Sequence, residues 1–215
     1  MTISHFESPI SETHRPAAAH RSSWKWRRRL AICATAVTLG WAGGKFLHAR
    51  FEQHKRMNAA RAVALLKNLA SAQAQLQASR RLDADGDGVG EYGDFAALVG
   101  GDRPYLSPAI LGDSPIRARA HGYLFEIVLS DDADLRETRW RVYAWPEEYG
   151  WTGEETIFAE SSGCVLRNSN ERHRYSGAAG RPPLDAALMA GENAGDEPRP
   201  AYNAVGFDGA FWRFT

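Results

Sequence analysis

Residues 62–76 read AVALLKNLASAQAQL, and the pattern of this stretch decides the fold expected for the rest of the chain. Its apolar side chains recur at spacings of three and four, which places them along one side of an α-helix. The stripe comprises Ala62, Leu65, Leu69, Ala72 and Leu76. Residues 45–85 contain no Gly or Pro and are rich in strong helix formers. The sequence therefore predicts a long helix whose stripe packs on the following domain or, alternatively, on a second helix in a coiled coil.

Upstream, the same helix leads back to an apolar segment. Residues 30–44 read LAICATAVTLGWAGG without a charge, and the cluster Lys25 to Arg29 stands just before them. A membrane-spanning helix needs about 20 mostly apolar residues, so residues 24–48 predict a single-pass anchor at the short end of that range. The basic cluster keeps the N-terminus inside, which places the domain outside the cytoplasm. A cleaved export signal and a buried soluble helix are the alternatives.

These segments divide the chain into four parts. Residues 1–23 predict a disordered cytoplasmic tail, and residues 24–48 the transmembrane signal anchor in the inner membrane. Residues 49–175 predict an extracytoplasmic α+β domain, and residues 176–215 a loop-rich C-terminal extension. The 26 basic and 26 acidic side chains cancel, so no global field favours nucleic acid.

The acidic loop after the helix carries the sharpest motif, DADGDGVGEYGD over residues 83–94. In a calcium loop of EF-hand type, oxygen ligands stand at positions 1, 3, 5, 7, 9 and 12, with Gly at position 6. The matching ligands here are Asp83, Asp85, Asp87, the Val89 carbonyl, Glu91 and Asp94. Gly90 at position 8 and an aspartate at position 12 depart from the pattern. The sequence thus predicts a calcium site that fixes the loop, with a solvated turn as the alternative.

Four strands follow the loop. Residues 121–129 place Tyr123, Phe125, Ile127 and Leu129 on one face of a first strand, and residues 138–145 alternate in a second. Residues 155–160 and 164–168 form a hairpin around Ser161 to Gly163. Asp131 to Asp134 predict a turn between the first two strands. Four strands in succession favour an antiparallel meander with the long helix on one face. The predicted fold is therefore α+β, a long N-terminal helix packed on a small antiparallel sheet of about four strands.

Taken together, this order of elements resembles type IV pilin-like proteins and the pseudopilins of type II secretion. Residues 65–100 resemble the planctomycete type of these proteins, in which a helix rich in Ala and Gln leads into D-x-D-G-D-G-x-G-E-Y. The Gly-Phe-Thr-Leu-Ile-Glu leader motif of pilins is absent from the sequence. The resemblance implies a structural or interaction role in the cell envelope, with self-association or a secretion or pilus-type assembly as partners.

A second resemblance covers the sheet region alone. The segment is similar to DUF2950, a bacterial family of unknown function, and the resemblance implies a shared sheet module without a known activity. It rests on Gly122-Tyr123, Phe125, residues 144–150, Thr152-Gly153, residues 156–158, Gly163 and Val165.

Signals for catalysis are few. A pairing of Cys164 with His173 is conceivable, but a small thiol at a strand start is more typical of a buried structural cysteine. Glu147, Glu148 and their neighbours are typical of a solvated rim, and no phosphate loop, nucleophile elbow or zinc spacing occurs. We therefore expect a non-enzymatic protein with no small-molecule substrate. An anchored ligand-binding or sensor module is the alternative, and a small hydrolase is a third.

Overall fold

A computed structural model describes the backbone of residues 19–193 and 196–215, with side chains from residue 45 onward. Helix α1 runs as one element from Ala19 to Ala78. Most of the predicted tail, residues 1–18, lies outside the described residues, and so do the side chains of the predicted anchor up to residue 44. Within the part of the chain that the structure describes, no helix combines the length and apolarity needed to cross a membrane.

The chain divides into two compact units, residues 1–50 and residues 51–215. In the second unit, α1 is followed by α2 (Phe95–Val99), a 3-10 turn (Pro108–Ile110) and two strands, β1 (Arg117–Ala120) and β2 (Tyr123–Val128). The short helix α3 (Ala133–Thr138) precedes β3 (Arg141–Pro146), β4 (Thr156–Glu160) and β5 (Val165–Asn168). The C-terminal segment adds β6 (Leu188–Met189), β7 (Arg199–Pro200), β8 (Ala204–Val205) and β9 (Phe211–Phe214).

The main sheet is antiparallel and has seven strands in the order β1-β2-β3-β4-β5-β9-β8, and β6 pairs with β7 separately. The prediction of an α+β fold is confirmed, and the four predicted strands are β2 to β5. The expected number of about four strands is wrong. The strands that the sequence did not signal are short: β1 reads Arg-Ala-Arg-Ala, and β8 has two residues. They form because neighbouring strands offer free edges, which outweighs their weak strand propensity.

Two turn residues account for β1. His121 and Gly122 both have positive φ, 54° and 72°, as a two-residue type I′ hairpin turn requires. This turn places Ala120 opposite Tyr123 and brings β1 alongside β2. The strand that was expected to include His121 therefore begins at Tyr123.

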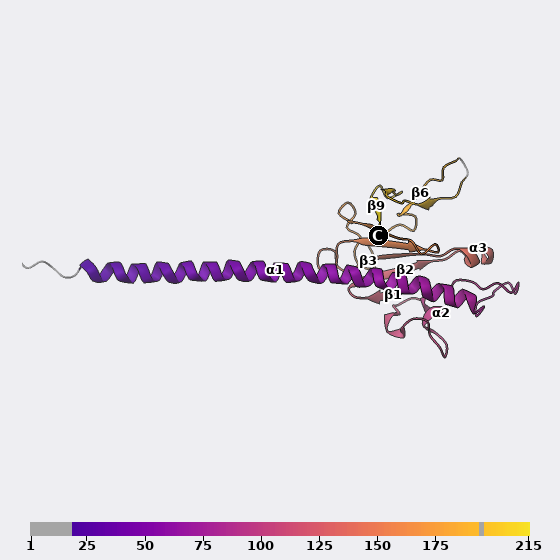
Figure 1. Cartoon of the computed structure of the whole chain (residues 1–215), viewed down its shortest axis with the longest axis horizontal. Helices are drawn as coiled ribbons and strands as arrows, with labels where there is room; N and C mark the ends of the chain where they lie inside the picture. The colour runs from indigo at the N-terminus through magenta and orange to yellow at the C-terminus, as the bar shows by residue number, and fades with distance from the viewer. Residues whose placement is uncertain (1–18, 194–195) are drawn as a thin grey trace, which may run out of the picture. The chain divides into compact units, whose positions relative to one another are not determined.

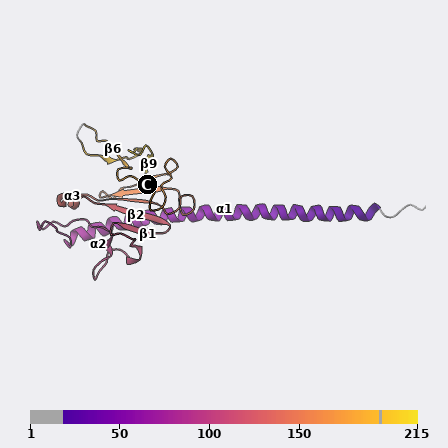
Figure 2. The ribbon, with the colours of Figure 1, turned by 180° about the vertical axis from the view of Figure 1, so that it is seen from behind.

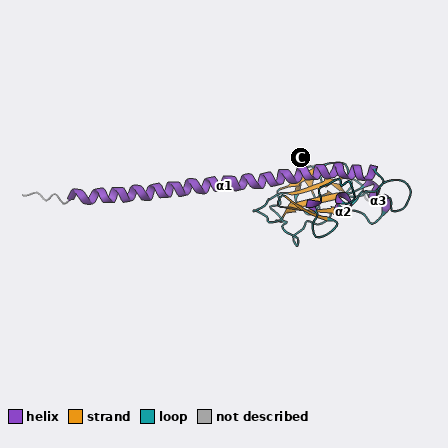
Figure 3. Cartoon of the chain, turned by 90° about the horizontal axis from the view of Figure 1, so that it is seen from below, coloured by secondary structure: helices purple, strands orange, loops and turns teal. Residues whose placement is uncertain are grey.

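One face of the sheet packs against the C-terminal part of α1, which lies over the strands in Figure 3. The predicted stripe is largely buried: Ala62, Leu69, Ala72 and Leu76 have at most 2% exposure, and Leu65 is half-buried. These side chains form a core with Phe125 of β2, Val142 of β3 and Ile157 of β4, together with α2. The helix stripe therefore packs on its own domain.

The other face of the sheet carries a second core that the C-terminal segment completes. Tyr143, Phe158 and Trp212 form a triangle of rings with centroids 5.0 to 6.4 Å apart. The Tyr143 hydroxyl donates to the Leu184 carbonyl at 3.2 Å. In Figure 1 and, from behind, in Figure 2, β6 and β9 lie on the side of the sheet away from α1. Residues 176–215, expected to be a loop-rich extension, thus supply two strands of the main sheet and several side chains of the second core.

Candidate functional site: the acidic loop and α3

The acidic loop begins where α1 ends. Arg80 takes a left-handed conformation with φ 53°, and the Ser79 hydroxyl donates to the Leu76 carbonyl at 2.6 Å, so the helix ends at Ala78. The loop then folds back on the last turn of the helix. A Cβ atom on Gly90 would lie 1.9 Å from the Gln77 carbonyl oxygen, so only glycine fits there. This close approach explains the glycine at the eighth position of the motif.

A buried side chain ties the far end of the loop to the helix. Gln73 has 0% exposure, its Nε2 donates to the Gly93 carbonyl at 2.6 Å, and its Oε1 accepts from the Gly93 amide at 3.0 Å. Both main-chain polar groups of a buried residue are thereby satisfied by one amide side chain. Gln73 therefore fixes the exit of the acidic loop, while the close approach at Gly90 fixes its middle.

The structure brings three of the six predicted ligands together. Asp83, Asp85 and Asp87 each offer a carboxylate oxygen within 4.8 Å of the other two. Their positions are set by the loop backbone: Asp83 accepts from the Gly86 and Gly88 amides at 2.8 and 3.2 Å. Asp87 accepts from the Val89 amide at 2.7 Å. Three carboxylates held this close repel one another unless a cation lies between them.

The other predicted ligands have structural roles in the loop. Glu91 is 2% exposed, and its carboxylate accepts from the Ala84 amide at 2.7 Å and lies 3.1 Å from Nη2 of Arg136. Asp94 is the N-cap of α2 and accepts from the Ala97 amide at 2.8 Å. The Val89 side chain is exposed, and its amide is the donor to Asp87. The structure therefore does not bring Glu91 and Asp94 into the aspartate cluster.

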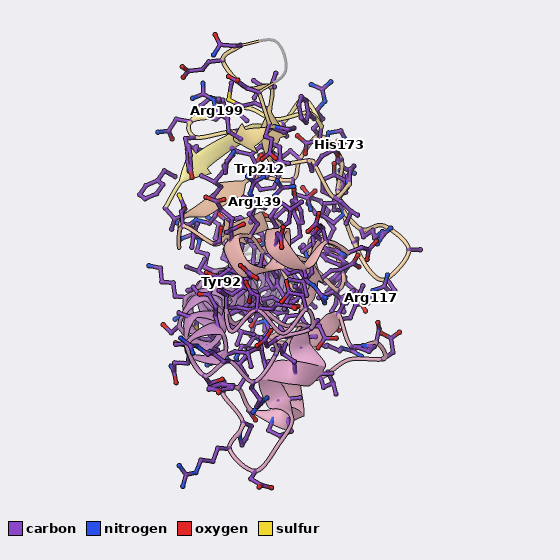
Figure 4. The ribbon with its side chains drawn as sticks, turned by 90° about the vertical axis from the view of Figure 1, so that its right-hand side faces the viewer. Tyr92, Arg117, Arg139, His173, Arg199 and Trp212 are labelled. Atoms are coloured by element: carbon purple, nitrogen blue, oxygen red, sulfur yellow. The ribbon has the colours of Figure 1, made fainter. Side chains whose placement is uncertain are left out.

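Helix α3 supplies acidic side chains that the sequence analysis missed. Asp134 and Glu137 lie three residues apart on this helix, and each offers an oxygen within 4.8 Å of the other and of Asp85. The Gln77 side-chain amide donates to the Glu137 carbonyl, and the Arg136 carbonyl accepts from the Tyr92 amide at 2.9 Å. Figure 4 looks onto this end of the domain, with Tyr92 and Arg139 labelled beside α3. The expected Asp131 to Asp134 turn is therefore the start of a helix that faces the acidic loop.

The aspartate cluster of the loop and the group formed with α3 share Asp85, and together they contain five carboxylates. Burial, followed by the charges of Asp87, Asp85 and Asp134, raises the pKa of Glu137 above its ordinary value. Its Oε1 atom is buried and has no hydrogen-bond partner among the described residues. Spacing in the sequence shows that Asp134 and Glu137 share a helix face, but only the tertiary fold brings that face to residue 85. Such a set of oxygen ligands suits a hard divalent cation, calcium above all.

A cavity of about 410 Å³ lies at the β1 edge of the sheet, away from the acidic loop. Its walls are mostly apolar, with Leu111, Leu124 and Trp145 beside Arg117 and Arg119. Nε of Arg117 lies 3.0 Å from the carboxylate of Glu126, which is 3% exposed and also pairs with Arg181. The volume falls within the usual range for small-molecule sites, about 300 to 1,000 Å³.

Cys164 and His173, the conceivable catalytic pair of the sequence, have separate surroundings in the structure. Nε2 of His173 lies 2.7 Å from the Asp208 carbonyl oxygen, and the ring stacks on Tyr175. Burial raises the pKa of the Cys164 thiol, the opposite of the shift that activates a nucleophile. The geometry thus favours structural roles for both side chains.

Comparison of the chain with protein-family models, curated proteins and solved structures found no match.

Proposed function

We propose that this chain is a membrane-anchored, pilin-like structural or interaction protein of the cell envelope, with its α+β domain held outside the cytoplasm. The observation that carries the proposal is the continuity of α1. One helix includes the apolar stretch 30–44 and continues to Ala78, where its last turns belong to the core of the domain. A helix that continues from an anchor into a hydrophobic core connects the domain to that anchor without a separate linker.

The topology is tested by fractionation and proteolysis of intact cells. We expect the full chain to pellet with membranes and to resist extraction at alkaline pH, because the apolar segment lies in the hydrocarbon core. Protease added outside the cytoplasmic membrane should digest the domain, because the basic cluster at Lys25 to Arg29 keeps the N-terminus inside. A domain that is protected until the membrane is dissolved would contradict the proposed orientation.

The calcium site is part of the same proposal. Calcium would lie among Asp83, Asp85 and Asp87, with α3 contributing oxygens through Asp134 and Glu137. Its role is to neutralise the carboxylates and join the acidic loop to α3, so that both segments become one rigid end of the domain. The support is the sharing of Asp85 between two carboxylate groups from distant parts of the sequence.

Calorimetric titration of the detergent-solubilised chain tests this site. We expect saturable binding at about 10⁻⁴ to 10⁻³ M calcium, the range of extracellular modules. Asp85→Asn should weaken binding at least about tenfold, because it removes the carboxylate common to both groups. Asp102→Asn, at an exposed aspartate outside the cluster, is the matched control and should leave binding unchanged. No heat at millimolar calcium would refute the site.

A ligand-binding or sensor module is the second candidate, and the cavity at the β1 edge favours it. Its apolar walls and the nearby Arg117 and Arg119 suit a small amphiphilic anion. Screening such compounds by thermal shift of the full chain tests the idea. Leu124→Trp, which fills the cavity, should abolish any stabilisation that a hit produces, and a hit that survives the substitution must bind elsewhere.

A further inference from the structure

The turn between β3 and β4 presents a tryptophan to solvent. Trp151 is 67% exposed, although tryptophan is mostly buried in folded domains. Its turn is tightly built: Gly150 has φ 81° and donates to the Gly153 carbonyl at 2.8 Å, and the Trp151 amide donates to the Glu148 carbonyl at 3.0 Å. The exposed ring is therefore held by an ordered turn, which lowers the entropic cost of any contact it makes.

The same turn contacts the first residues of the second compact unit, which belong to α1. Nδ2 of Asn58 on α1 donates to the Thr152 carbonyl at 2.9 Å. The Trp151 ring meets the ring of Phe51 edge-on, with centroids 5.2 Å apart, and the Lys55 ammonium lies 5.3 Å from the Phe51 ring centre. Trp151 and Phe51 thus form one aromatic pair at the point where the domain joins the preceding part of α1.

Covalent connection limits how far this pair can lie from the predicted anchor. Phe51 is three residues beyond residue 48 on the same helix, so it lies at most about 4.5 Å further from the anchor along the helix axis. The headgroup layer of a bilayer adds about 5 to 8 Å on each side of the hydrocarbon core. Phe51 therefore falls within the depth of that layer, and the Trp151 ring, which contacts it, lies beside it.

We propose that Trp151, with Phe51, inserts into the lipid headgroup interface and so fixes how the domain rests on the membrane. The inference rests on the proposed membrane anchor and extends it to a second lipid contact. Tryptophan suits this layer because its ring has an apolar body and a polar N–H edge. Lys45, Arg50 and Arg56 on the adjoining stretch of sequence suit anionic headgroups.

Fluorescence of the full chain in vesicles tests the proposal. The probe is a phosphatidylcholine and phosphatidylglycerol bilayer whose acyl chains carry bromine near the headgroup, which quenches tryptophan by contact. The emission of Trp151 is the difference between the wild type and Trp151→Phe, a substitution that keeps an aromatic ring against Phe51. We expect this difference to shift to shorter wavelength on reconstitution and to lose most of its intensity in brominated vesicles.

The control places a tryptophan of comparable exposure elsewhere on the domain. Phe211 on β9 is 51% exposed, and Phe211→Trp in the Trp151→Phe background should keep a water-like emission in the same vesicles. Equal quenching at the two positions would overturn the inference, because the contact would not belong to the β3–β4 turn.

Flotation separates this inference from the proposed function. If the chain does not float with vesicles, the anchor itself fails and the lipid contact fails with it. If the chain floats and the emission of Trp151 is the same in brominated and ordinary vesicles, the anchor stands and the inference is refuted. Melting of Trp151→Phe at the wild-type temperature shows that the comparison concerns folded protein.

Discussion

Replacing Gln73 by leucine should destabilise the domain strongly while keeping the side-chain volume. Gln73 satisfies both main-chain polar groups of Gly93, and both residues are buried. Leucine fills the same space on α1, but it leaves the Gly93 amide and carbonyl without partners. A buried polar group deprived of its partner costs about 1 to 3 kcal/mol. The two together predict a loss of about 2 to 6 kcal/mol in the free energy of unfolding.

Chemical denaturation followed by circular dichroism gives the free energy of unfolding, and thermal melting gives a second reading. For a domain of this size each kcal/mol lowers the melting temperature by about 2 to 4 °C, so the variant should melt about 4 to 24 °C below the wild type. Calcium binding should weaken as well, because Gly93 lies at the exit of the acidic loop.

Gln75→Leu is the matched control, since Gln75 stands two residues away on the same helix and is exposed. It should change stability by less than about 0.5 kcal/mol. If the two variants were equally stable, the hydrogen bonds between Gln73 and Gly93 would have no energetic weight, and the account of how the loop is held would be refuted.

Three further outcomes follow from the same region and from the α1–sheet contact. Gly90→Ala should lower the melting temperature and weaken calcium binding together, because the new Cβ would meet the Gln77 carbonyl; an unchanged melting temperature would contradict this packing. Because the pKa of Glu137 is raised above 4.5, the calcium-free domain should lose stability as pH rises through the folded-state pKa; Glu137→Gln should flatten that part of a melting-temperature scan, and an identical profile would argue against the cluster. Burial lowers the pKa of Lys55. Hydrogen bonds and charge from Glu154 and Glu52 outweigh burial and raise this pKa above 10.5. This ion pair therefore stabilises the domain fully below pH 10.5 and loses its effect as pH rises through the folded-state pKa, and Lys55→Met should lose that alkaline transition in a denaturation series.

Long, strongly patterned elements were predictable from the sequence. The stripe in residues 62–76 and the face shared by Tyr123, Phe125 and Ile127 indicate which side of each element packs into the first core, which is a local property. Short strands have too few residues to show such a periodic pattern. The strand β1 reads Arg-Ala-Arg-Ala and exists because His121 and Gly122 turn the chain back onto it. Likewise, the pairing of β9 depends on the free edge of β5, which residues 211–214 do not reveal by their own pattern.

In the candidate site, too, some residues were predictable from local spacing and others depend on the tertiary fold. The alternation of Asp83, Asp85 and Asp87 brings three carboxylates together through local turns, and the sequence reveals it directly. The contributions of Asp134 and Glu137 depend on α3 folding against the loop, a contact between segments about 50 residues apart. Glu91 fits the ligand spacing, yet its burial beside Arg136 gives it a different partner, which spacing alone does not reveal.

The second core also dictates when this domain can finish folding. The face of the sheet toward α1 is complete once β5 has been synthesised, because all its partners precede residue 168. The opposite face is completed later, first by residues between 175 and 201 and last by Trp212, which closes the ring triangle with Tyr143 and Phe158. A nascent chain therefore exposes part of this aromatic face while residues 169–212 are being synthesised. A chain threaded across a membrane in that state would cross before the sheet is sealed and complete its fold on arrival.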